Sequence, residues 1–180
     1  MTKKQLEKKL NTLKESDELI PMLLDLYASN KTFKEIMEVS FSEKAAEEQF
    51  HKYIDRIERI FFPADIMRSG FSIDTAKAVL EQYCSKTSDP DMIATYNLNF
   101  AEYCLQFTET YGDIDDEFYT VLEDTFMVAI NRAAEDRTYY DNMHDNMARM
   151  IKRCGSFGWG VYDYLSYELS SVDKMWEKRS

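Results

Sequence analysis

The chain has 180 residues, of which 44% are hydrophobic and 14% aromatic, and its 22 Lys and Arg against 33 Asp and Glu give a formal net charge of −11. This composition is too apolar for a disordered chain, and charged residues interrupt every apolar run before the length of about 18 residues that a membrane span needs. We therefore expect one globular domain, residues 1–180, with a sizeable core. The acidic balance also disfavours direct binding to nucleic acid or to an anionic membrane.

The negative charge is concentrated in one quarter of the chain. Residues 1–60 carry 11 basic and 12 acidic side chains, whereas residues 87–131 contain ten acidic side chains and no Lys or Arg. The net charge is therefore a local feature of the middle of the chain.

The three cysteines, Cys84, Cys104 and Cys154, are odd in number, widely spaced and placed within apolar patterns. This usage is typical of free thiols in a reducing compartment rather than of a disulfide framework. The basic start of the chain is not followed by the apolar segment of a signal peptide. Together these features predict a cytoplasmic location.

Short helices are predicted for residues 1–41. Five glycines and three prolines leave few turns for a β-rich fold, and apolar residues recur at intervals of three and four. Thr2 followed by Gln5 is the sequence of a capping box at the start of the first helix. Ser16 or Asp17 can cap the second helix.

Three helical hairpins are predicted for residues 42–178, at 42–86, 89–135 and 138–178. Asp89 followed by Pro90 is a typical helix start, an N-cap residue before proline at the first helical position. Ser42 is an N-cap for the first hairpin, and Gly112 and Gly155 end helices within the second and third. The buried face of the last helix is expected to consist of Tyr162, Leu165, Leu169, Val172 and Trp176.

The helix predicted for residues 90–110 has apolar residues on two sides. One stripe contains Ile93, Tyr96, Phe100, Tyr103 and Phe107, and the other contains Ala94, Leu98, Ala101 and Leu105. Such a helix must be buried on both sides, as in the middle of a stack. The sequence therefore predicts an all-α fold of antiparallel hairpins stacked as a short HEAT-like right-handed solenoid, with a compact helical bundle as the alternative.

Carboxylates of the central hairpin form the candidate binding surface. It consists of Glu102, Glu109, Asp113, Asp115, Asp116, Glu117, Glu123 and Asp124. The alternating acids of residues 113–117 lack the glycine that an EF-hand needs at the sixth position, where Phe118 stands. Acids also cap helix N-termini and complement the helix dipole. Cation binding and capping both remain open here, and we assign no metal ligand and no cofactor.

No catalytic signature is present. His51 and His144 lack the spacing of a zinc motif, and no phosphate-binding glycine loop follows a strand. We therefore assign no catalytic residue and expect no enzyme. The glycine-rich segment 155–160 predicts a tight turn in which Phe157 and Trp159 either pack against the core or form an exposed aromatic anchor for a partner.

The segments Thr110-Tyr111-Gly112-Asp113-Ile114-Asp115-Asp116-Glu117-Phe118-Tyr119, Gly158-Trp159-Gly160-Val161-Tyr162-Asp163 and the Leu-Leu-Asp-Leu-Tyr of residues 23–27 resemble a family of small bacterial proteins known only as a domain of unknown function. The resemblance spans most of the chain and implies an all-helical fold. It implies no activity, cofactor or catalytic residue. Tyr162 departs from the pattern, since we would expect His there.

These features favour a non-catalytic protein-interaction module whose acidic central surface binds another protein of basic character. One alternative is an acidic inhibitor that mimics nucleic acid and binds a basic protein. The other is a metal-binding protein or enzyme that uses the carboxylates of residues 109–117. The identity of the partner and the oligomeric state are left open.

Overall fold

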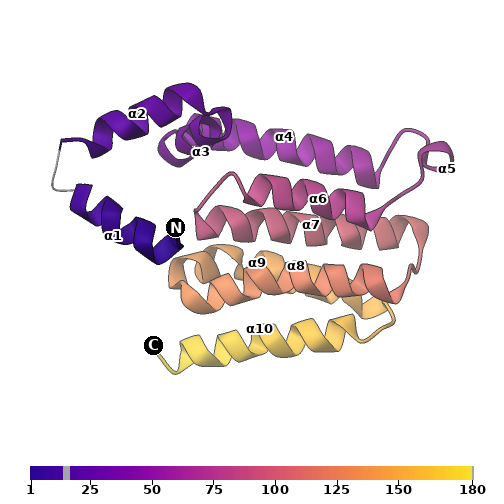
Figure 1. The fold of residues 1–180 in the computed structure, drawn as a ribbon. Coiled ribbons are helices and arrows are strands. Elements are labelled where there is room, and N and C mark those ends of the chain that lie inside the picture. Colours follow the sequence, from indigo (N-terminus) through magenta and orange to yellow (C-terminus); the bar gives the residue numbers. More distant parts are fainter. Residues whose placement is uncertain (14–16, 180) are drawn as a thin grey trace. The chain divides into compact units, whose positions relative to one another are not determined.

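The structure of the chain is a computed structural model that describes residues 1–13 and 17–179 (Figure 1). The described residues form helices and no strand, which confirms the prediction of an all-α fold. The helices are α1 (Lys3–Leu13), α2 (Leu19–Ser29), α3 (Lys31–Phe41), α4 (Glu43–Phe61), α5 (Ile66–Ser69), α6 (Ile73–Cys84), α7 (Pro90–Tyr111), α8 (Asp116–Glu135), α9 (Arg137–Arg153) and α10 (Val161–Glu177), with a short 3-10 helix over Cys154–Ser156.

The chain divides into two compact units, Met1–Glu47 and Glu48–Ser180. The boundary lies within α4, close to the predicted start of the three hairpins, and the prediction of a single domain stays a prediction. In the first unit, Thr2 and Gln5 form the predicted capping box, with the Thr2 N–H donating to Gln5 Oε1 over 2.9 Å. Glu18 precedes α2, so Asp17 is not its N-cap, and Ser16 lies outside the described residues.

The predicted helix boundaries of the second unit follow local chemistry. The Asp89 carboxylate accepts the N–H of Asp91 over 2.9 Å, and Pro90 is the first residue of α7. Gly112 ends α7 with a φ of 89°, in the region that glycine enters without a steric penalty. Asp115 then starts α8 by accepting the N–H of Phe118 over 2.9 Å. These contacts confirm that the central hairpin turns where its caps predict.

Helix α7 lies in the middle of the second unit and contacts α6, α8 and α9. Both predicted apolar stripes are represented in its core. Its buried apolar residues are Ala94, Tyr96, Leu98, Phe100, Ala101, Cys104, Leu105 and Phe107. Burial on two sides is confirmed, and only a narrow edge of α7 reaches solvent.

The hairpins α7–α8 and α9–α10 pack with alternate helices in contact. Helix α7 contacts α9, and α8 contacts α10, in addition to the contacts between successive helices. Helices α8 and α10 run in the same direction (Figure 1). This arrangement fits stacked hairpins, and a compact bundle of the same hairpins is also compatible with it.

The prediction that Tyr162 belongs to the buried face of α10 is wrong. The Tyr162 side chain is 44% exposed, whereas the neighbouring Val161 is fully buried. The buried stripe starts at Val161 and continues through Leu165 and Leu169, at intervals of four. Because successive residues are about 100° apart around a helix, Tyr162 points away from the core.

Candidate functional site at the junction of two turns

Two turns far apart in the sequence meet at one end of the second unit. The indole Nε1–H of Trp159, before α10, donates to both carboxylate oxygens of Asp113, before α8, over 3.0 and 3.2 Å. The Tyr119 hydroxyl donates to the same carboxylate over 2.7 Å. The Tyr-Gly-Asp-Ile-Asp and Gly-Trp-Gly motifs are therefore in direct contact.

The Asp113 carboxylate is the centre of this junction. The hydrogen bonds from Tyr119 and then from Trp159 hold the pKa of Asp113 below its ordinary value. Burial, followed by the hydrogen bond to this carboxylate, raises the pKa of Tyr119. Asp113 is therefore ionised at neutral pH, and its charge serves contacts within the protein.

Trp159 is exposed and yet held in place. Its backbone has a φ of 67°, and no other described non-glycine residue has a positive φ. Such a conformation costs about 1 to 3 kcal/mol and persists only where the surroundings hold it. The bond to Asp113 does so, together with stacking on Tyr119 at 6.0 Å between ring centroids. The side chain is nevertheless 54% exposed, so a fixed indole faces solvent.

The two residues proposed as an aromatic anchor differ in their surroundings. Phe157 is half-buried and packs against the core, with its ring 6.4 Å from that of Tyr119. Of the two, Trp159 alone has the exposure that an anchor for a partner requires.

A surface hollow of about 460 Å³ lies between the two turns. Glu109 and Asp113 line it from the α7 end, and Ser156, Phe157 and Gly158 line it from the second turn. Both carboxylates in this hollow already accept hydrogen bonds from other side chains. The hollow therefore lacks an uncommitted charged group.

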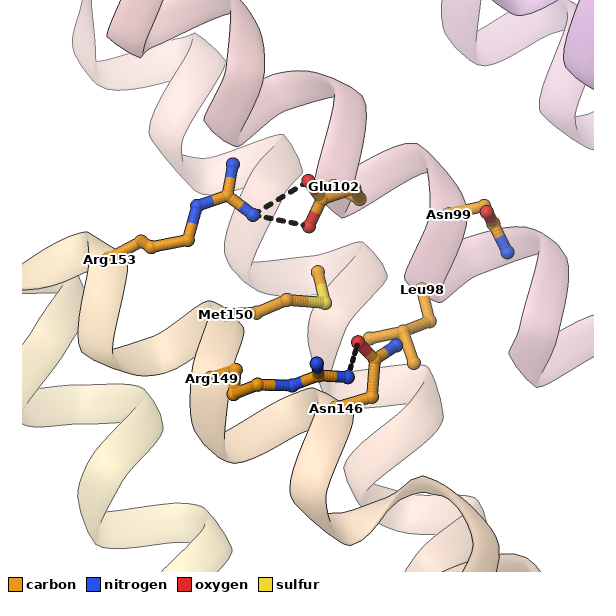
Figure 2. A pocket seen from close by; sticks show the side chains of 7 residues that line it. All are labelled: Leu98, Asn99, Glu102, Asn146, Arg149, Met150 and Arg153. Atoms are coloured by element: carbon orange, nitrogen blue, oxygen red, sulfur yellow. Dashed lines mark hydrogen bonds and ion pairs between the residues drawn. The ribbon is translucent and has the colours of Figure 1, made fainter.

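Arg153 at the end of α9 forms ion pairs with two predicted surface acids of α7. Its Nη1 donates to both oxygens of Glu102 over 2.6 and 2.8 Å (Figure 2). Its Nε and Nη2 donate to Glu109 over 2.8 Å each. Glu109 and Glu102 raise the pKa of Arg153, and the hydrogen bond from Arg153 lowers the pKa of Glu109. We call this group the Arg153 clamp. This clamp was not predicted from the sequence, because Glu102 and Arg153 are 51 positions apart and meet only where α9 packs on α7.

The remaining predicted acids lie at the start of α8 and along its exposed side. Asp115 is the helix cap described above. Asp116, Glu117 and Asp124 are exposed, and Glu123 is half-buried. None of these four forms an ion pair within the described part of the chain. The eight predicted residues thus differ in their contacts, since some form ion pairs, hydrogen bonds or caps within the chain and others form no ion pair among the described residues.

One carboxylate of α10, Glu168, joins those of α8. Burial and then the charges of Asp124 and Asp116 raise the pKa of Glu123. Burial, followed by the charges of Glu168, Glu123 and Asp124, raises the pKa of Tyr164 on α10. We define the acidic face as Asp116, Glu123, Asp124 and Glu168. Glu168 was not predicted, because its helix is remote in sequence from the acidic hairpin.

The cysteines offer no activated nucleophile. Cys104 and Cys154 are buried and Cys84 is half-buried. Burial raises the pKa of Cys84 to about 11 and that of Cys154 to about 12. All three are therefore thiols at neutral pH, and the thiol is the unreactive form.

Within residues 1–13 and 17–179, no group of three or more His, Cys, Asp and Glu side chains could hold a metal ion. No helix in these segments is long and apolar enough to cross a membrane. A comparison of the chain with models of protein families, with curated proteins and with solved structures finds no match. The resemblance noted from the sequence stays a prediction, and function must be argued from the geometry.

Proposed function

We propose that the chain is a non-catalytic, cytoplasmic protein-interaction module that binds a basic partner protein through the acidic face of α8 and α10. One observation carries the proposal. The four carboxylates of this face have no ion-pair partner in the described chain, whereas Glu102 and Glu109 of α7 share an arginine. Uncompensated charge on one face is suited to a partner of opposite charge.

Mutual repulsion leaves this face electrostatically unfavourable in the free protein. The raised pKa of Glu123 reflects partial burial together with two neighbouring carboxylates. A basic partner would relieve the repulsion, and the local field would also accelerate its association at low salt. The carboxylates of the acidic face can therefore form ion pairs with a partner, whereas Glu102 and Glu109 of α7 already form theirs with Arg153.

Exposed aromatic residues lie on α10 and just before it, and Tyr164 is close enough to the acidic face that, in addition to burial, the carboxylates of that face raise the pKa of the tyrosine. Tyr164 and Tyr167 on α10 are 41% and 68% exposed, and the fixed indole of Trp159 precedes the same helix. Tyr and Trp are enriched among the residues that dominate binding energy at protein interfaces. A surface that combines rigid aromatic groups with unpaired carboxylates fits a basic, partly apolar protein segment.

The mimicry of nucleic acid is a weaker account of the acidic residues. Duplex DNA carries one charge per about 1.7 Å. Pairing with Arg153 compensates one of the two negative charges of Glu102 and Glu109, and Asp113 and Asp115 are engaged in hydrogen bonds within the chain. The density of uncompensated negative charge that remains is lower than that of DNA and favours a protein partner of moderate charge.

Affinity capture from the cytoplasm of the source cells, read by mass spectrometry, tests the proposal. The variant Asp116→Lys/Asp124→Lys/Glu168→Lys should lose the basic proteins that the wild type captures. The matched control Asp55→Lys/Glu58→Lys/Glu81→Lys makes the same charge change at exposed positions of α4 and α6 and should retain them. Retention of every captured protein by the first variant would show that the acidic face is not the site.

A further inference from the structure

A second hollow, distinct from the acidic face, lies between α7 and α9 (Figure 2). It has a volume of about 470 Å³. Leu98 of α7 and Met150 of α9 contribute apolar side chains that are each 2% exposed. The Glu102–Arg153 pair of the clamp closes one end of the groove.

Arg149 is the uncompensated charge of this groove. Its Nη2 donates to Asn146 Oδ1 over 3.3 Å, and its Nε donates to the carbonyl oxygen of Asp145 over 3.2 Å. Both contacts lie within α9, and no carboxylate among the described residues pairs with Arg149. Arg153, one helical turn further along, has two. The exposed guanidinium of Arg149 therefore retains donors for a ligand.

Two amides that line the groove add unused hydrogen-bonding groups. The Oδ1 atom of Asn146 accepts from Arg149, which leaves its Nδ2 as a donor at the groove. Asn99, on the opposite helix, donates its Nδ2 to the carbonyl oxygen of Thr95 over 2.9 Å, which leaves its Oδ1 as an acceptor. A few polar groups around an apolar floor are the usual composition of a small-ligand site.

The charges present limit what this site can hold. Arg149 supplies one positive charge, and the planar fork of a guanidinium matches the two oxygens of a carboxylate. The Glu102 carboxylate at the end of the groove opposes a second negative charge on the ligand. Because Leu98 and Met150 are each only 2% exposed, they offer a small apolar contact next to the charged group, which suits a short aliphatic body.

We propose that the groove between α7 and α9 binds a monocarboxylate with a short aliphatic body, held by Arg149 and Asn146 over the floor of Leu98 and Met150. A free acid and the C-terminal residue of a peptide share this chemistry. The inference does not depend on the acidic face, because Arg149 and the groove lie on other helices.

Methyl NMR of the full chain labelled at the methionine methyl groups tests the inference. The probes are 4-methylpentanoate, its uncharged amide, inorganic phosphate, and acetyl-Ala-Leu with a free or an amidated C-terminus. We expect saturable shifts of the Met150 methyl signal with 4-methylpentanoate or with the free-acid peptide, and whichever binds identifies the source. The amides and phosphate should bind at least about tenfold more weakly, since a charge-assisted hydrogen bond contributes about that factor.

Variants on α9 give a control for each outcome. Arg149→Gln should weaken binding about tenfold, whereas Lys152→Gln, an exposed cation on the same helix outside the groove, should leave it unchanged. Arg149→Lys should fall between them, because it keeps the charge and loses the fork. The inference is overturned if neither acid shifts Met150, if the amides or phosphate bind as tightly, or if Arg149→Gln binds like the wild type.

Discussion

The two sides of the central hairpin place similar acidic residues in opposite situations. On α7, Glu102 and Glu109 share the guanidinium of Arg153, whose single positive charge compensates one of their two negative charges. On α8, Glu123 and Asp124 face Glu168 and Tyr164 of α10, and no ion pair compensates them in the described chain. The difference lies in the facing helix, since α9 brings an arginine to α7 and α10 brings another carboxylate to α8. Net charge alone therefore does not identify a binding surface.

The largest expected effect is a loss of stability caused by a substitution on the buried side of α7. The smaller stability changes expected for the charged residues can be compared with it. Leu105 is fully buried, and Leu105→Ala should lower the free energy of unfolding by about 2 to 5 kcal/mol through lost burial and a cavity. Urea denaturation measures this change. A loss below about 1 kcal/mol would contradict burial of α7 on both sides.

Breaking the Arg153 clamp should have an intermediate effect. Arg153→Met leaves Glu102 and Glu109 without their cation, and because all three side chains are between 27% and 40% exposed, solvent screening limits the loss to about 1 kcal/mol. Adding Glu102→Gln and Glu109→Gln should restore part of it in a double-mutant cycle. Additive losses would show that the three residues do not interact.

The pH dependence of stability should also distinguish the two sides. Glu109 has a pKa below its ordinary value, so its contribution is present above the pKa of the unfolded chain and is lost as the pH falls through the lowered pKa. Glu123 has a raised pKa, so its ionisation destabilises the fold as the pH rises. Denaturation between pH 3 and pH 7 should therefore show a steeper acid loss for Glu123→Gln than for Glu109→Gln. Equal slopes would contradict the assignment.

The smallest expected effect on stability is a gain at the acidic face. Glu123→Gln removes repulsion from Asp124 and Asp116 and should raise the free energy of unfolding by a few tenths of a kcal/mol at neutral pH. The matched variant Glu102→Gln should lower it, because it removes an ion pair. A lower free energy of unfolding for Glu123→Gln would contradict net repulsion at Glu123.

The turn junction allows a local test with a spectroscopic readout. In a Trp176→Phe background, Trp159 is the single tryptophan, and Asp113→Ala removes the acceptor of its indole. We expect greater mobility of the indole, seen as lower fluorescence anisotropy. Asp116→Ala, an exposed neighbour, should leave the anisotropy unchanged. Unchanged anisotropy in Asp113→Ala would show that Asp113 does not hold Trp159.

The parts of this architecture that follow from nearby residues were predictable. Asp89 and Asp115 cap their helices through bonds to amides two or three residues away, and the two stripes of α7 specify its burial. The error at Tyr162 is a shift of one position in the register of a helix face. Sequence periodicity tolerates such a shift near a helix end, and Gly160, the N-cap of α10, has no side chain whose capping hydrogen bond would mark where the helix starts.

The composition of the candidate sites was less predictable, because it depends on how helices pack. The contact of Arg153 with Glu102 joins residues 51 positions apart, and that of Trp159 with Asp113 spans 46. Proximity in the sequence grouped eight acids that the fold separates into paired, capping and unpaired sets. It also omitted Glu168, which only the packing of α10 on α8 brings to the acidic face.

The contrast between the two sides can be measured directly by titrating the side-chain carboxyl groups in one NMR experiment. The account predicts that Glu109 titrates below the ordinary range of a glutamate and that Glu123 titrates above it. Equal pKa values for the two groups, or a pKa of Glu109 above that of Glu123, would contradict the division into a side whose acids pair with arginine and an acidic face available to a partner.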